Sequence, residues 1–198
     1  LRGTALAYLA ALRREDADDG EAFALELSAR AESATNMTDE LAALTALEKT
    51  GRVAAWDAAL EAFAAKWVDH PLVMLKWLDL QSRAEVEGNA ARVKACMEHP
   101  AFVASTPNCC YSLFLPFSRT AAAFHAADGS GYAFMGDAVL AIDKINRQVA
   151  SRMVSSFNCY RDYEPKRRAL MRAQIERIAD EPGVSPNVLE IVTKALKD

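Results

Sequence analysis

The chain has 198 residues, a formal net charge of −4 and a hydrophobic fraction of 52%. This length suits one domain or two small ones with a substantial core, and it needs no disulfides for stability. The acidic balance argues against a nucleic-acid partner. No apolar run approaches the ~20 residues that span a bilayer, which argues against a membrane partner.

Apolar residues recur at helical spacing along the chain, and strand alternation is nearly absent. Asn36 or Thr38 can cap a helix that Gly51 ends, and prolines open later helices at positions where the first turn tolerates a missing donor. In chain order, the predicted helices cover residues 2–14, 21–34, 37–51, 53–67, 71–80, 89–98, 109–117, 132–144, 147–161, 166–180 and 187–196.

Two of these helices differ in how their apolar residues are arranged. One carries a single apolar stripe made of Val53, Trp56, Leu60, Phe63 and Trp67. The next is apolar on most sides, through Leu72, Val73, Leu75, Trp77, Leu78 and Leu80, and we expect it to be buried and central.

Short connections between about ten short helices make neighbouring helices antiparallel. The sequence therefore predicts an all-α fold of stacked αα-hairpins that curls into a superhelix with a concave face. A compact, irregular all-α domain is the alternative.

Residues that could carry chemistry are few. The four cysteines, Cys96, Cys109, Cys110 and Cys159, match neither a zinc site nor a disulfide scaffold, and we expect them to be reduced. The three histidines, His70, His99 and His125, do not form the two-histidine helical zinc motif. A thiol hydrolase that uses Cys109 or Cys110 is conceivable, but no histidine is paired with either in sequence. The basic run of Lys166, Arg167, Arg168 and Arg172 is typical of a solvated helix face.

The stretch FHAADGSGYAF, residues 124–134, predicts a sharp corner between two helices. Gly129 and Gly131 are expected to supply positive φ angles, and Asp128 and Ser130 to bond nearby backbone N–H groups. The helix that follows presents a seam of Tyr132, Met135, Val139 and Ile142. No base, nucleophile or metal ligand accompanies His125, so we interpret it as a structural histidine.

Six stretches carry a resemblance to a known family. They occur in order as NMTDELAALTAL, DHPLVMLKWLDLQS, HPAFVASTPN, FHAADGSGYAF, NRQVASR and IVTKAL. Together they resemble the C-terminal helical domain of zinc-dependent aminopeptidase N, in the branch found in bacteria and protozoa. The resemblance runs from about residue 30 onward, and the earlier residues match only as generic helix.

The resemblance implies a parent gluzincin metallopeptidase that removes N-terminal amino acids from peptides. Its single zinc ion would lie on an upstream catalytic domain, and these 198 residues would form one C-terminal domain with no cofactor and no catalytic residue of its own. That domain would be an ARM/HEAT-like helical bowl that encloses the active-site chamber. Its partners would be the upstream catalytic and β-sandwich domains and peptide substrates.

The family motif near the start of a late helix matches Gln148 and Arg152 here. The resemblance implies that Gln148 lines the pocket for the first side chain of the substrate and that Arg152 faces the pocket beyond the scissile bond. Their i, i+4 spacing places both on one helix face. Arg147 replaces the family's proline between Asn146 and Gln148, which could change where the helix begins.

A second motif follows Asn108, which the resemblance places among the substrate-binding residues. The family has arginines one and three residues after it, whereas this chain has Cys109 and Tyr111. Tyr111 would give the chamber an aromatic wall in place of a positive charge. Leu75 also replaces a family aspartate, and we expect only the loss of an interhelical contact.

The chain starts at Leu1 rather than at methionine, which favours a piece of a longer polypeptide. We expect a cytoplasmic setting in peptide breakdown, and self-association of the isolated chain through an exposed apolar patch. The rival hypothesis is a free-standing helical scaffold that binds a protein or peptide along its concave face.

Overall fold

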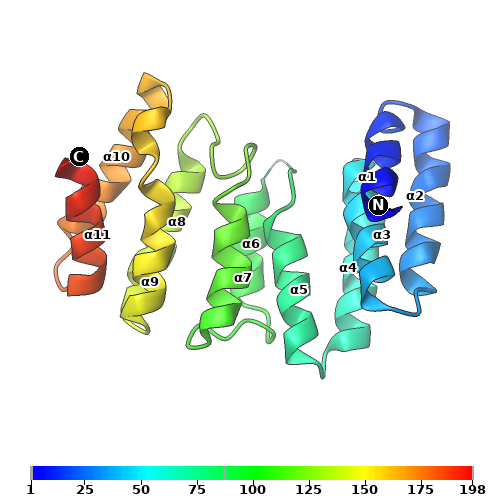
Figure 1. The fold of residues 1–198 in the computed structure, drawn as a ribbon, viewed down its shortest axis with the longest axis horizontal. Helices are drawn as coiled ribbons and strands as arrows, with labels where there is room; N and C mark the ends of the chain where they lie inside the picture. The colour runs from blue at the N-terminus through cyan, green and yellow to red at the C-terminus, as the bar shows by residue number, and fades with distance from the viewer. Residues whose placement is uncertain (1, 87, 198) are drawn as a thin grey trace. The chain divides into compact units, whose positions relative to one another are not determined.

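The computed structural model describes residues 2–86 and 88–197. Within that part of the chain it contains eleven α-helices and two short 3₁₀ turns (Figure 1). The helices are α1 (Arg2–Leu12), α2 (Ala17–Glu32), α3 (Met37–Lys49), α4 (Val53–Trp67), α5 (Pro71–Ser82), α6 (Asn89–Met97), α7 (Pro107–Phe117), α8 (Ser130–Asp143), α9 (Arg147–Val154), α10 (Pro165–Ala179) and α11 (Pro186–Lys197), with the 3₁₀ turns η1 (Ser155–Phe157) and η2 (Tyr160–Asp162) between α9 and α10.

Helix boundaries follow the capping chemistry of the sequence. Asn36, and not Thr38, caps α3, because its side chain accepts the backbone N–H of Asp39 at 2.9 Å. Gly51, with φ of 72°, follows the end of α3 as predicted. The start of α2 lies four residues before the predicted one, because the Asp16 side chain accepts the N–H of Asp19 at 2.8 Å.

The predicted helix 147–161 is wrong beyond Val154. The chain continues there as η1 and η2, where the i→i+3 bonds of Asn158 to Ser155 and of Asp162 to Cys159 replace the α-helical pattern. This segment contains Ser155, Ser156 and Asn158, and the polar side chains of such residues compete for backbone hydrogen bonds and disfavour a helix interior.

The chain forms two compact units, residues 1–77 and 78–198, and α5 crosses the division. In unit 1, α1 packs on α3, and α2 packs on α3 and α4. The indole of Trp56 is 1% exposed and donates from Nε1 to the carbonyl of Leu44 at 3.1 Å, which joins α4 to α3. Arg52 joins the start of α4 to the α1–α2 turn by donating to the carbonyls of Arg14 and Asp16, at 2.8 and 2.7 Å.

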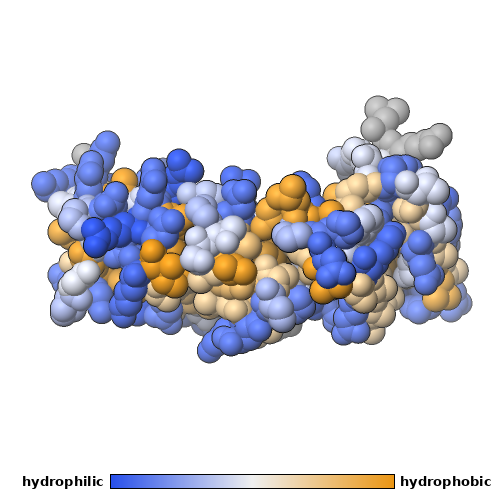
Figure 2. Space-filling model, turned by 90° about the horizontal axis from the view of Figure 1, so that it is seen from below, coloured by the Kyte–Doolittle hydropathy of each residue, from blue (hydrophilic) through white to orange (hydrophobic). Residues whose placement is uncertain are grey.

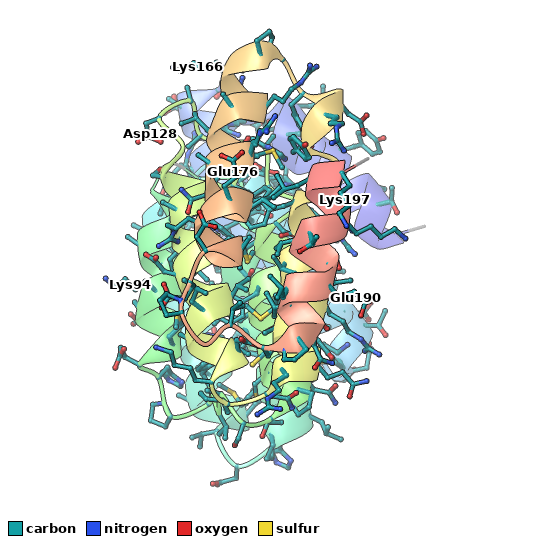
Figure 3. The ribbon with its side chains drawn as sticks, turned by 90° about the vertical axis from the view of Figure 1, so that its left-hand side faces the viewer. Lys94, Asp128, Lys166, Glu176, Glu190 and Lys197 are labelled. Carbon is teal, nitrogen blue, oxygen red and sulfur yellow. The ribbon has the colours of Figure 1, made fainter. Side chains whose placement is uncertain are left out.

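In unit 2 the helices pair as α6 with α7, α8 with α9 and α10 with α11. Further packing of α7 on α9 and of α9 on α11 makes one layer, and α6, α8 and α10 make the other (Figure 1). Figure 3 shows Glu176 on α10 and Glu190 and Lys197 on α11 projecting outward, whereas the residues of these helices that are buried are apolar: Met171, Ile175, Ile178, Val188 and Val192. The predicted all-α class built from stacked helix hairpins is therefore confirmed.

The apolar residues of α4 and α5 are not all buried. In the α4 stripe, Trp56, Leu60 and Phe63 are buried, but Val53 is 41% exposed. In α5, Leu72 is 77% exposed, so this helix is not enclosed at its start. Hydrophobic and hydrophilic residues are intermingled on the face in Figure 2. Among the described residues, the large apolar side chains with the highest exposure are Tyr8, Leu12 and Leu72.

Candidate functional site

The candidate site lies in unit 2, where α7 and α9 pack side by side. Arg152 on α9 donates from Nη1 to the hydroxyl of Tyr111 on α7 at 3.2 Å. Its guanidinium carbon also lies 5.4 Å from the centre of the Tyr111 ring, within the range of a cation–π contact. Arg152 is exposed and Tyr111 is half-buried, so the pair is accessible from solvent.

The start of α9 does not depend on proline. Asn146 caps the helix by accepting the N–H of Val149 at 3.1 Å, and Arg147 takes the first helical position with its side chain exposed. Gln148 in the first turn is exposed, one turn before Arg152. With Arg147 at this position, α9 still begins directly after Asn146, and Gln148 and Arg152 lie one turn apart on it.

Asn108 is exposed in the first turn of α7, one turn before Tyr111. Among the described residues, neither the Asn108 nor the Gln148 side chain hydrogen-bonds to Tyr111 or Arg152. The structure thus brings two of the four predicted site residues into contact and places the other two beside them along their own helices.

The thiols near this face are unsuited to nucleophilic attack. Cys109 and Cys110 are buried, and their Sγ atoms donate to the carbonyls of Ala101 and Ala104 at 3.7 and 3.3 Å. Burial raises the pKa of Cys110 to about 11, with a smaller contribution from Cys109. Since the thiolate is the nucleophile, this environment argues against the thiol-hydrolase hypothesis.

His125 has the structural role expected of it. Its Nδ1 lies 2.8 Å from the Tyr132 hydroxyl, its Nε2 lies 3.0 Å from the Tyr163 hydroxyl, and its ring stacks on Tyr163 at 4.4 Å. Burial, followed by the charge of Arg167, lowers the pKa of His125 and favours the neutral ring. The histidine thus connects the 120–126 segment, α8 and the turn before α10.

The two positions of this corner require glycine for different reasons. Gly129 has φ of 79°, as predicted. The expected positive φ at Gly131 is wrong, because Gly131 lies inside α8 and is not among the positive-φ glycines of the described chain. A Cβ at Gly131 would lie 2.2 Å from the carbonyl oxygen of Ala123, so glycine is needed there for close backbone approach.

Comparison with known families decides where the chain belongs. The family described as "Domain of unknown function (DUF3458_C) ARM repeats" matches residues 1–197. The chain belongs to this family. Its description as ARM repeats agrees with the predicted superhelical stacking of hairpins. Because the match begins at residue 1, the first thirty residues of this DUF3458_C domain belong to the family as well.

Relatives of the DUF3458_C domain include two curated aminopeptidases N. That of Caulobacter vibrioides is 39% identical over 165 residues, and that of Escherichia coli is 37% identical over 164 residues. The matches cover 83% and 82% of this chain but 19% of each relative. The chain thus spans about a fifth of the length of the curated relatives that it matches.

A solved structure with a similar fold is that of Legionella pneumophila aminopeptidase A in complex with aspartic acid. It has a TM-score of 0.84 and 29% identity, and the match covers 90% of this chain and 21% of that one. Together, these matches confirm the resemblance to the C-terminal domain of aminopeptidase N.

Two further features concern metal binding and the membrane. Among the described residues of the DUF3458_C domain, no three His, Cys, Asp or Glu side chains form a group that could hold a metal ion. In the same part of the chain, none of the helices has the length and apolar character needed to cross a bilayer. All four cysteines are free thiols.

Proposed function

We propose that this chain is the non-catalytic C-terminal domain of a zinc aminopeptidase that releases N-terminal amino acids from peptides. The observation that carries the proposal is that 83% and 82% of the chain match about a fifth of the two aminopeptidase N relatives. In this proposal both units act as one domain, which covers the active-site chamber of the same polypeptide and restricts the access of peptides. The free thiols suit a cytoplasmic setting.

Enclosure has a direct physical benefit for such an enzyme. A chamber excludes folded proteins, and the removal of bulk water strengthens the electrostatic interactions around substrate and metal. A zinc ion bound in the catalytic domain would polarise the scissile carbonyl and activate a water molecule. The described residues offer no group that fits this ion, so we assign the zinc to the catalytic domain and no chemical step to this chain.

The contribution of this chain is instead to the substrate pocket. We assign Gln148 to the pocket for the first side chain and Arg152 to the pocket beyond the scissile bond, with Tyr111 and Asn108 beside it. The hydrogen bond from Arg152 to Tyr111 supports this assignment, because it fixes an otherwise flexible guanidinium at the exposed face between α7 and α9. Tyr111 then contributes both an acceptor for Arg152 and an aromatic surface for an apolar substrate residue.

The proposal is tested by comparing the 198-residue chain with the native-length polypeptide that contains it. The short chain should bind no stoichiometric zinc and hydrolyse no aminoacyl substrate, whereas the native-length polypeptide should contain one zinc per chain and lose its activity to a chelator. Metal analysis and an aminoacyl-anilide assay measure both. Chelator-sensitive hydrolysis by the short chain would contradict the assignment, as would a native gene product that ends where this chain ends at both termini.

Tyr111→Arg should change the preference of the native-length enzyme for the second residue of its substrates. We expect kcat/KM for dipeptides with leucine or phenylalanine in second place to fall about tenfold relative to kcat/KM for dipeptides with glutamate there. This factor corresponds to a loss of about 1.4 kcal/mol in transition-state stabilisation. Arginine removes the aromatic surface and places a second cation beside Arg152. Steady-state kinetics on the dipeptide pairs measure the ratio.

Two control variants show which property of the side chain causes that result. Tyr111→Phe keeps the ring and removes only the hydroxyl that accepts from Arg152, so it should retain the preference for apolar second residues. Ala91→Arg adds the same charge at an exposed position on α6, in the other layer, and should change nothing. An unchanged ratio in Tyr111→Arg would refute the role of Tyr111 in specificity.

A further inference from the structure

A groove of about 510 Å³ lies in unit 1 between α2 and α4, with α3 as its floor. Most of its wall is apolar and small, formed by Leu25, Ala31, Leu44, Ala58, Ala59 and Ala62. Its volume is within the range of small-molecule sites, about 300–1,000 Å³. Nothing in the proposed aminopeptidase role uses this groove.

The groove also contains a buried carboxylate. The Glu40 side chain is 5% exposed, and its Oε1 accepts from Lys66 Nζ at 3.0 Å and from Trp67 Nε1 at 3.2 Å. Within the described chain, no donor reaches the second oxygen, Oε2. A carboxylate can accept about four hydrogen bonds, and a buried charge is stable only when it is well paired. Glu40 therefore has capacity for a donor that enters through the groove.

Lys66 supplies the opposite charge at the same place. Its side chain is 41% exposed and also lines the groove. An ammonium has three donors, and one of them is directed at Glu40, so the remaining N–H groups can meet an acceptor from outside. The groove thus combines an apolar trough with an anion and a cation that are 3.0 Å apart.

We propose that this groove binds an α-amino acid with an apolar side chain, either free or as the first residue of a short peptide. The α-ammonium group donates to Glu40 Oε2, the carboxylate or carbonyl oxygen accepts from Lys66, and the side chain lies against the alanines of α4. Charge complementarity selects this ligand class, because a simple cation would leave the apolar wall unused and a hydrocarbon would give Glu40 Oε2 no donor. The inference does not depend on the aminopeptidase assignment.

The probes are L-leucine, L-leucinamide, N-acetyl-L-leucine, glycine and the peptide Leu-Gly-Gly, added to the ¹⁵N-labelled 198-residue chain. We expect saturable amide shifts in α2 and α4 with leucine, with a Kd on the order of 1 mM. N-acetyl-leucine has no ammonium group and glycine has no apolar side chain, so each should bind at least about tenfold more weakly. A free amino acid as the natural ligand predicts that leucine binds more tightly than leucinamide and Leu-Gly-Gly, whereas a peptide end predicts equal or tighter binding of Leu-Gly-Gly.

Two pairs of variants locate the binding. Glu40→Gln removes the charge without changing the shape of the side chain, and Glu26→Gln is its control at an exposed position outside the groove. Ala62→Leu fills the groove from an exposed position on α4, and Ala54→Leu adds the same side chain to the same helix away from the groove. Both groove variants should weaken leucine binding at least about tenfold, and both controls should bind as the unmodified chain does.

Each alternative result is decisive. The proposal fails if leucine gives no saturable shift, if N-acetyl-leucine binds as tightly as leucine, or if Glu40→Gln binds normally. Should Glu40→Gln unfold, as judged by circular dichroism, Ala62→Leu still decides, since its substitution is on the exposed side of α4. Normal leucine binding by Ala62→Leu would exclude the groove as the binding site.

Discussion

Gly131→Ala is expected to destabilise unit 2 by about 3 kcal/mol, because overpacking a close-packed site costs up to about that amount. The added Cβ would lie 2.2 Å from the carbonyl oxygen of Ala123 and 2.5 Å from that of Phe124. Both are backbone atoms, so the clash cannot be relieved by a side-chain rotation, and α8 must shift away from the 120–126 segment. For a chain of this size, the melting temperature should fall by about 10 °C.

Amide hydrogen exchange of α8 provides the local measurement, and circular dichroism gives the melting temperature. Gly88→Ala is the matched control, because a Cβ at Gly88 meets nothing within 4 Å. Its φ of 73° still costs about 1 kcal/mol for a residue with a side chain. Equal losses in the two variants would show that close approach at Gly131 is not what requires glycine there.

The corner at residues 124–134 shows what a sequence pattern can predict and what it cannot. Two closely spaced glycines after an aspartate predict a turn, and the turn is present, with Asp128 accepting the N–H of Ser130 at 2.9 Å. The pattern contains no information about which backbone passes closest, so the reason for Gly131 was not predictable. The hydrogen bonds of His125 are equally non-local, since Tyr163 is 38 residues away.

The candidate site likewise has one part that the sequence predicts and one part that depends on tertiary packing. Helical periodicity alone predicts that Gln148 and Arg152 share a face of α9. The contact between Arg152 and Tyr111 depends on the packing of α9 against α7, across 41 residues, and periodicity carries no signal for it. The expectation that the family has an arginine at the position of Tyr111, which rests on the resemblance alone, was the one sequence signal that drew attention to this residue.

Glu40 shows why the burial of a charged residue is hard to predict from the sequence. An acidic residue in the first turn of a helix is a common, exposed feature that favours the helix dipole. Here the same residue is buried, and it accepts hydrogen bonds from Lys66 and Trp67, which follow it by 26 and 27 residues. The groove beside Glu40 exists because α4 presents alanines toward α2, and the sequence shows those alanines without showing which helix they face.

Asp143→Ala should cost about 3 kcal/mol, since a hydrogen bond to a charged group contributes about 1.5–3 kcal/mol. Asp143 is 7% exposed at the end of α8, and its Oδ2 accepts the backbone N–H of Ser185 at 2.7 Å. Its Oδ1 accepts the Ser185 hydroxyl, so both bonds join α8 to the turn before α11. Alanine would leave the buried N–H of Ser185 without its acceptor.

Hydrogen exchange at α8 and α11 measures the loss, because all three tryptophans lie in unit 1 and fluorescence does not report directly on this contact. Asp143→Asn keeps one acceptor oxygen and should lose about half as much. Ser185→Ala removes only the hydroxyl, and the double variant Asp143→Ala/Ser185→Ala should be less destabilised than the sum of the singles, by about 1–2 kcal/mol. Additive losses would show that the two side chains act independently, whereas Asp69→Ala at an exposed position should stay within about 0.5 kcal/mol of the unmodified chain.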